Sequence, residues 1–141
     1  MAIVKWTNHK IDRAGSQRKV QAEAAIRAEA VLTTSYVDTS WVDTAESNAT
    51  QLTFLFKFTK GSLTSIESQI WVSNDAVTWY QEPTESISAT TITETPAEYT
   101  RTADGNWPRT VPVAARYYKL KVKGTGTVTG SLLQIIANGR W

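Results

Sequence analysis

The sequence predicts an all-β protein, an antiparallel β-sandwich or jelly roll preceded by an extended basic N-terminal arm. Three observations predict this class. Threonine occurs 21 times in 141 residues, and Thr, like Val, Ile, Tyr and Trp, fits the half-buried surface of a sheet better than a helix. Short segments alternate apolar and polar side chains with a period of two, and turn residues separate them. Strands do not alternate with long helical segments, which argues against a parallel βαβ fold.

The length and composition indicate one folded domain. With 141 residues, 41% of them hydrophobic and 20% charged, the chain can enclose a single core. We assign residues 1–27 to the arm, residues 28–138 to the β-sandwich and residues 139–141 to a C-terminal tail. The chain has no cysteine, which suits a reducing cytoplasm. It shows no recognisable signal peptide and no membrane-spanning apolar run, so we expect no membrane partner.

The N-terminal part of the chain contains the most ambiguous segment. Residues 1–20 show no sustained periodicity and predict the extended arm. Between Val20 and Leu32 apolar residues alternate with period two, while the Ala, Glu and Arg content also suits a helix. We favour a strand from Ala28 to Tyr36 and keep a short helix over residues 18–31 as the alternative.

The clearest strand signal follows Asn48. Residues 51–59 place four large apolar side chains on one face: Leu52, Phe54, Phe56 and Phe58. In residues 64–73, Ile70 and Val72 lie on the face opposite Trp71. Because only a short loop joins these two segments, we expect them to pair as an antiparallel hairpin.

The following segments predict shorter strands and turns. Residues 74–76 form a turn signal, because Asn and Asp side chains satisfy local backbone groups. Strands are expected at residues 77–81, 86–93 and 98–102. Two prolines, Pro108 and Pro112, flank an extended piece that we expect at a sheet edge.

The last part of the chain predicts two strong strands. Residues 116–123 place Tyr118, Leu120 and Val122 on one face and lysines on the other. Residues 124–126 are expected to be a hairpin turn. Residues 128–137 carry apolar groups on both faces, which predicts a strand buried on both sides.

Enzyme chemistry is not expected. A Cys–His pair is impossible because the chain has no cysteine. A Ser–His–Asp triad is poorly supported, because the sole histidine, His9, lies in the arm. A zinc or other transition-metal site is equally unsupported. The carboxylates are spread over strands and turns, and the glycines form no phosphate-binding loop. We therefore predict no catalytic residues, no metal and no cofactor.

The charge distribution suggests what the chain binds. The net charge is +2, but residues 1–32 carry six basic and three acidic side chains, residues 33–105 three and ten, and residues 106–141 six and none. The basic ends can meet an acidic protein surface, including the acidic middle of a neighbouring copy. The first twenty residues have one aromatic side chain, so we do not expect a nucleic-acid partner.

The six tryptophans are candidate binding residues, because tryptophan is enriched at protein interfaces. Trp6 and Trp141, near the ends of the chain, are expected to contact other subunits. Trp79, Tyr80 and Trp107 are left open between core and surface, and exposed together they would suit a sugar.

Residues 52–61, 70–80 and 116–124, with the Thr-Gly-Ser strand that follows, resemble small virion proteins of tailed bacteriophages, the capsid decoration or cement proteins. The likeness covers roughly residues 30–137. It implies a jelly roll or sandwich that oligomerises on the outside of a capsid. Such proteins clamp neighbouring major capsid subunits, often with an extended terminal arm.

From this resemblance we expect a dimer or trimer, made in the host cytoplasm, that binds the major capsid protein on the virion exterior. The residues expected to bind capsid or neighbouring subunits are Lys5, Trp6, Lys10, Arg13, Arg18, Lys19, Trp71, Arg140 and Trp141. One alternative is a tail or neck component of the virion. Another is a carbohydrate-binding module that uses Trp79, Tyr80 and Trp107.

Overall fold

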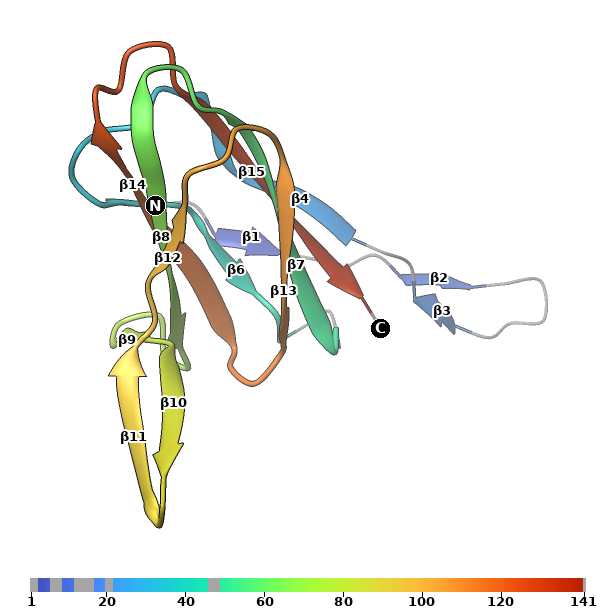
Figure 1. Cartoon of the computed structure of the whole chain (residues 1–141). Helices are drawn as coiled ribbons and strands as arrows, with labels where there is room; N and C mark the ends of the chain where they lie inside the picture. The colour runs from blue at the N-terminus through green and yellow to red at the C-terminus, as the bar shows by residue number, and fades with distance from the viewer. Residues whose placement is uncertain (1–2, 6–8, 12–16, 20–21, 46–48, 141) are drawn as a thin grey trace.

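The computed structural model describes residues 3–5, 9–11, 17–19, 22–45 and 49–140. For residues 3–5, 9–11, 17–19 and 22–23 it describes the backbone alone. No helix occurs in these residues, and two large sheets pack face to face (Figure 1). The predicted all-β sandwich is confirmed.

One layer is a seven-stranded sheet. Its strands are β1 (Ile3–Lys5), β5 (Val37–Asp38), β6 (Trp41–Asp43), β8 (Leu63–Ser73), β9 (Tyr80–Gln81), β12 (Tyr99–Arg101) and β14 (Tyr117–Gly126). The order is β1-β6-β14-β8-β12, with β5 paired to β14 and β9 paired to β8. The β1–β6 pair is parallel and the other pairs are antiparallel.

The second layer is a four-stranded antiparallel sheet. Its strands are β4 (Ala22–Ala30), β7 (Gln51–Thr59), β13 (Trp107–Pro112) and β15 (Leu132–Arg140), in the order β13-β7-β15-β4. Two hairpins lie outside both layers. They pair β2 (His9–Ile11) with β3 (Gln17–Lys19) and β10 (Pro83–Ser88) with β11 (Thr91–Pro96).

The core lies between the inner faces of the two layers. The four side chains predicted to share one face of β7 are all buried there, each no more than 4% exposed. The seven-stranded sheet contributes Ile66, Ile70, Tyr118, Leu120 and Val122. Strand β15 is buried on both faces, as predicted, and β13 with its two prolines is an edge strand, as predicted.

Two expected hairpins are instead crossings between the layers. β7 pairs with β15, and β8 pairs with β14, so neither β7–β8 nor β14–β15 is a pair. The two crossings pack on each other: the Ser62 N–H donates to the Thr129 carbonyl at 3.1 Å. A Cβ added to Gly61 would lie 2.4 Å from the Gly130 carbonyl carbon. Alternation predicts which face of a strand is apolar, but it does not identify the neighbouring strand, and here the apolar faces meet across the core.

The N-terminal part of the sandwich begins earlier than predicted. Strand β4 starts at Ala22 rather than at Ala28, pairs with β15, and excludes the alternative of a helix over residues 18–31. Ile26 is only 2% exposed, and Ala24 packs against the core. Burial of alternate side chains therefore outweighs the helix propensity of the alanines. Residues 31–36, the second part of the expected strand, lie outside any strand.

The expected free arm and tail are also partly integrated into the sheets. β1 adds to β6 as a parallel strand, and β2 and β3 form a hairpin. At the other end, β15 continues through Arg140, which pairs with Gln51. Strand pairing satisfies the backbone groups of these segments, which an isolated extended chain would leave to water.

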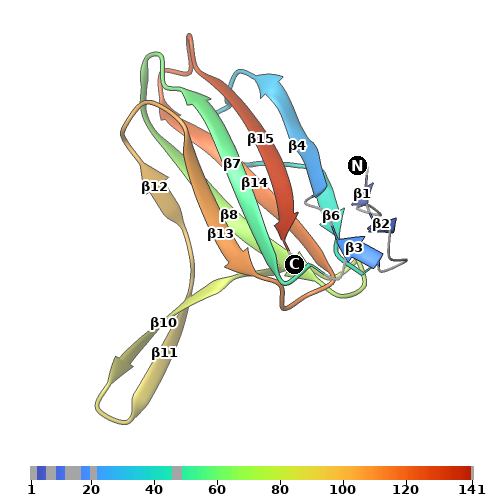
Figure 2. The ribbon, with the colours of Figure 1, turned by 90° about the vertical axis from the view of Figure 1, so that its right-hand side faces the viewer.

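The strands between residues 77 and 102 also differ from those predicted. Only Tyr80 and Gln81 of the segment 77–81 are a strand, while 99–101 form β12. The expected strand over residues 86–93 contains a tight turn instead. Ala89 at this turn has a φ of 53°, and the strands on its two sides form the β10–β11 hairpin. Figures 1 and 2 both show this hairpin extending away from the sandwich.

Candidate functional site

The outer face of the seven-stranded sheet gathers lysines and aromatic rings. Side chains on β8 and β14 alternate, so Trp71 lies opposite Lys119 and Gln69 lies opposite Lys121 on the solvent side. This arrangement confirms the predicted faces of both strands. We call this surface the lysine–aromatic face; its residues are Tyr36, Trp41, Trp71, Trp79, Lys119, Lys121 and Lys123.

Each lysine of this face lies over an aromatic ring. The Lys119 Nζ is 4.4 Å from the centre of the Trp79 ring, the Lys121 Nζ 4.2 Å from Trp71, and the Lys123 Nζ 4.8 Å from Tyr36. Contacts of this kind contribute about 0.5–2 kcal/mol each, depending on exposure. The ammonium groups therefore lie against the aromatic rings, and Lys119 is itself buried.

One carboxylate pairs with two of the three lysines. Asp38 accepts from Lys119 at 2.9 Å and lies 3.7 Å from the Lys121 Nζ. Glu67 is buried and accepts hydrogen bonds from Ser65 and Thr125. The lysine–aromatic face is thus an ordered surface whose positive charge is partly paired.

One hydrogen bond and one ring contact order aromatic side chains of this face. The Trp71 indole N–H donates to Gln69 at 2.9 Å, and the Trp41 and Trp79 ring centres are 6.0 Å apart with a tilt of 49°. Burial, with the neighbouring Glu98 carboxylate, raises the pKa of Tyr36 above its ordinary value.

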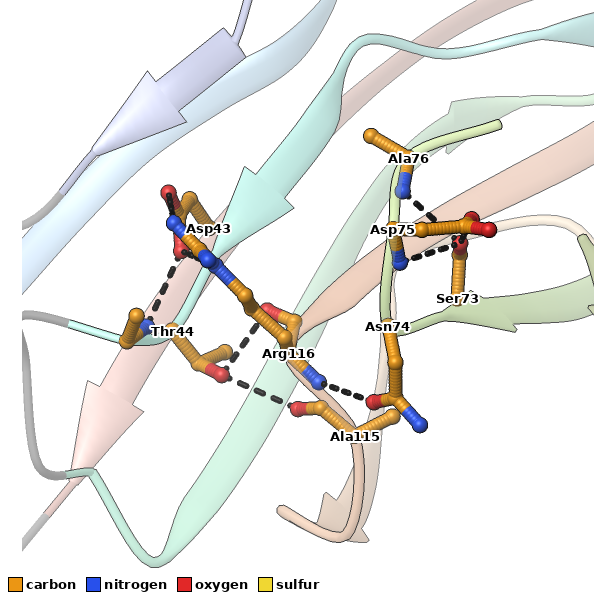
Figure 3. A network of polar contacts seen from close by, with 9 residues as sticks. Asp43, Thr44, Ser73, Asn74, Asp75, Ala76, Ala115 and Arg116 are labelled. Atoms are coloured by element: carbon orange, nitrogen blue, oxygen red, sulfur yellow. Dashed lines mark hydrogen bonds and ion pairs between the residues drawn. The ribbon is translucent and has the colours of Figure 1, made fainter. Parts of the chain in front are cut away.

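A polar network holds the loop that precedes Trp79 (Figure 3). Arg116 pairs with Asp43 at 3.3 Å and its backbone N–H donates to Asn74. Thr44 donates to the carbonyls of residues 115 and 116. Asp75 accepts from Ser73 and from the backbone N–H groups of residues 77 and 78, which lowers its pKa to about 2. These bonds order the loop and thereby position the Trp79 ring.

The β10–β11 hairpin, named here the projecting hairpin, has every residue exposed. The pairing puts Ser and Thr on one face and three matched pairs on the other: Pro83 with Pro96, Glu85 with Glu94, and Ile87 with Ile92. The two isoleucines are 74% and 62% exposed. A lone two-stranded hairpin is marginally stable in water, so this element has the character of a surface that contacts another protein.

This hairpin was not predicted, although the sequence contains a signal for it. Residues 83–96 read nearly the same in both directions around Ala89 and Thr90, with Pro, Glu and Ile at mirrored positions. The Thr-rich composition hid the turn, because no Gly, Asn or Asp marks it.

A second cluster closes one side of the sandwich, between the edge strands β12 and β13. The Arg101 guanidinium lies 4.7 Å from the Trp107 ring centre, and the Arg109 guanidinium 3.6 Å from Tyr99. Trp107 in turn stacks on Phe56 at 4.4 Å. We call these four residues, Tyr99, Arg101, Trp107 and Arg109, the arginine–aromatic edge.

In the part of the chain that the structure describes, neither arginine of this edge is paired with a carboxylate at contact distance. The Nε atoms of Arg101 and Arg109 are buried without a hydrogen-bond partner among the described residues. Glu82 lies nearby, but burial raises its pKa, with Arg109 acting in the opposite direction, and its Oε2 atom also lacks a hydrogen-bond partner. The arginine–aromatic edge is therefore positively charged and incompletely satisfied.

The residues predicted to bind other subunits fall in several places. Trp6, Arg13 and Trp141 lie outside the described residues. The backbones of four lie in strands of the N-terminal segment: Lys5 in β1, Lys10 in β2, and Arg18 and Lys19 in β3. Arg140 is exposed at the end of β15, while Trp71 belongs to the lysine–aromatic face.

The residues considered for a sugar are divided between surfaces. Trp79 belongs to the lysine–aromatic face, Trp107 to the arginine–aromatic edge, and Tyr80 is 66% exposed on β9. A pocket of about 220 Å³ lies beside Trp107; it is lined by Leu55, Phe56, Lys57, Asn106, Trp107 and Pro108. Trp79 packs against Lys119 on the seven-stranded sheet and Trp107 stacks on Phe56 of the four-stranded sheet, so the three aromatic side chains do not form one platform.

The described residues contain no group of three or more His, Cys, Asp or Glu side chains that could hold a metal ion. Among them there is also no helix long and apolar enough to cross a membrane. Comparison of the sequence with models of known protein families gives no match. Comparison with curated proteins gives no match either.

Proposed function

We propose that this protein is a structural component of a bacteriophage virion that binds the outside of the capsid and links neighbouring major capsid subunits. The proposal joins the sequence resemblance to an assembly role for the exposed elements. In it, the protein is not an enzyme, needs no cofactor, and acts as a dimer or trimer on the virion exterior.

The projecting hairpin is the observation that carries the proposal. A hairpin with all residues exposed and two isoleucines in water gains little from its own chain. Its position beyond the sandwich, seen in Figure 2, gives it reach toward another molecule. A protein that works in an assembly accounts for such an element, whereas a catalytic role does not require it.

The basic N-terminal segment supplies the proposed capsid contact. Residues 1–19 contain five basic side chains and one acidic side chain, and Lys10 lies opposite Arg18 in the β2–β3 hairpin. Two basic residues at one register position of a hairpin favour an acidic protein surface. Many copies on one shell act together, because a docked copy raises the effective concentration of its neighbours' contacts.

Binding to bare capsids tests the proposal. The full chain should co-sediment with purified capsids and appear on their outer surface in electron micrographs. Coated capsids should also survive heating better than bare ones. A chain lacking residues 1–18 should fold and fail to bind. If the full chain leaves capsids bare, or if it is found only on the tail or neck of native particles, the capsid role is wrong.

A charge-matched pair of variants sharpens this test. Lys10→Glu with Arg18→Glu should abolish capsid binding, because both cations of the β2–β3 pair are reversed. Lys60→Glu with Ser62→Glu and Thr127→Glu makes the same change in net charge at exposed or partly exposed loop positions, and should bind as the unmodified chain does. Equal loss in both variants would point to net charge alone instead of the N-terminal segment.

A further inference from the structure

The projecting hairpin carries an internal conflict on one face. Glu85 and Glu94 lie directly opposite each other, and like charges at such positions destabilise a strand pair. Beside them, Ile87 and Ile92 expose most of their surface. A surface complementary to two carboxylates and two neighbouring aliphatic side chains has cations beside an apolar recess.

The arginine–aromatic edge offers that combination. Its two guanidinium groups are stacked on aromatic rings and have no carboxylate partner at contact distance in the described part of the chain. The pocket beside Trp107 is lined largely by apolar side chains. Trp107 contacts the Arg101 guanidinium and also lines this pocket, so one residue links the cation and the recess.

The spacing on the hairpin is compatible with this pairing. Residues two apart on a strand are about 7 Å apart and share a face, so Glu85 and Ile87 can reach a guanidinium and an adjoining recess together. Carboxylates that meet arginine forks form short, charge-assisted hydrogen bonds.

The contact must involve side chains, because β13 is a poor template for another strand. The Val113 N–H donates to the Thr50 carbonyl on the β7 side. The direction of the backbone N–H and C=O groups alternates along a strand, so those of residues 108, 110 and 112 point away from β7. Two of these are prolines without an N–H.

A hairpin cannot reach the edge of its own sandwich in the observed structure, since Figures 1 and 2 show it pointing away from the body. We propose that the projecting hairpin of one copy docks on the arginine–aromatic edge of a second copy, with Glu85 and Glu94 on Arg101 and Arg109. This contact rests on the assembly role proposed above and specifies how the copies join. Hairpin and edge are different surfaces, so the contact forms a reciprocal dimer when it occurs twice about a two-fold axis, a ring when the rotation between copies closes, and an open filament when it does not.

Sedimentation analysis of the full chain tests the contact over a range of protein concentrations. The unmodified protein should self-associate to a dimer or a closed ring. Glu85→Arg with Glu94→Arg should weaken association by about tenfold or more, because four cations then meet. Ser86→Arg with Thr93→Arg adds two arginines to the opposite face of the same hairpin, and should associate nearly as the unmodified chain does.

A charge swap separates contact from folding. Arg101→Glu with Arg109→Glu should also fail to self-associate, and an equimolar mixture with the Glu85→Arg, Glu94→Arg chain should regain association. If the edge variant does not fold, the hairpin variants still test the contact, because every residue of the hairpin is exposed. A monomeric unmodified protein, or unchanged association after reversal of the two glutamates, would overturn the contact.

The two proposals fail differently. A chain that stays monomeric but coats capsids would remove the copy-to-copy contact and leave the capsid role standing. A chain that self-associates through the hairpin but ignores capsids would do the reverse.

Discussion

The sandwich and the projecting hairpin are built from the same strand pattern but differ in what their side chains meet. In β7 every second residue is buried against the opposite sheet, whereas in β10 and β11 all residues are exposed. Both regions satisfy their backbone groups by pairing. The difference shows that period-two alternation and strand pairing do not by themselves provide stability, which comes from the apolar area removed from water.

The largest expected effect is a cavity in the sandwich. Phe56→Ala should lower the free energy of unfolding by about 3–5 kcal/mol, because Phe56 is 1% exposed and stacks on Trp107. Urea denaturation measures this loss. Ile87→Ala at the hairpin is the control, and it should change the stability of the monomer by less than about 0.5 kcal/mol. Similar losses at both positions would mean that the hairpin is part of the core.

The next effect concerns the packed crossings between the layers. Gly61→Ala should cost about 1–3 kcal/mol, because Gly61 has a φ of 57° and a Cβ there would collide with the Gly130 backbone. Gly105→Ala is the matched control. Its φ is 99°, but nothing lies within 4 Å of the added carbon, so its cost should be the smaller of the two. Thermal unfolding of both variants compares them.

A smaller effect is expected inside the hairpin, and it has the opposite sign. Glu85→Gln with Glu94→Gln removes the repulsion between facing carboxylates and should stabilise the β10–β11 pairing by about 0.2–1 kcal/mol. Hydrogen exchange of the hairpin amides in the monomer should slow, while exchange in β7 stays unchanged. Faster hairpin exchange would show that the carboxylates do not repel each other in the free protein.

The smallest expected effect on stability appears only at alkaline pH and concerns Tyr36 on the lysine–aromatic face, a residue type that the projecting hairpin lacks. The raised pKa of Tyr36 means that the folded state retains this proton more strongly than the unfolded state. The resulting stability is present below the ordinary pKa of 10.0 and is lost as the pH rises above it. A spectrophotometric titration should show a late-ionising phenol that is absent in Tyr36→Phe. Its persistence in that variant would assign it to another tyrosine.

The candidate surfaces were predicted unevenly from the sequence. Alternation placed Trp71 and the lysines of β14 on the solvent side correctly, because those strands are regular. It could not show that Trp79 joins them, since a loop held by Asp75 and Arg116 brings that ring into place. The pairing of Arg101 with Trp107 and of Arg109 with Tyr99 joins strands of different sheets, which no local pattern encodes.

The sequence by itself determined the all-β class, the inward faces of β7, β8 and β14, the edge position of β13, and the burial of β15 on both sides. These properties depend on side chains two residues apart, which the chain order specifies. Only the tertiary structure decided that β7 pairs with β15 and β8 with β14, that β4 is a strand, and that residues 83–96 form a hairpin outside the body. The physical reason is that strand partners are selected by the closing of a shared core between distant segments, and its free energy is absent from any single segment.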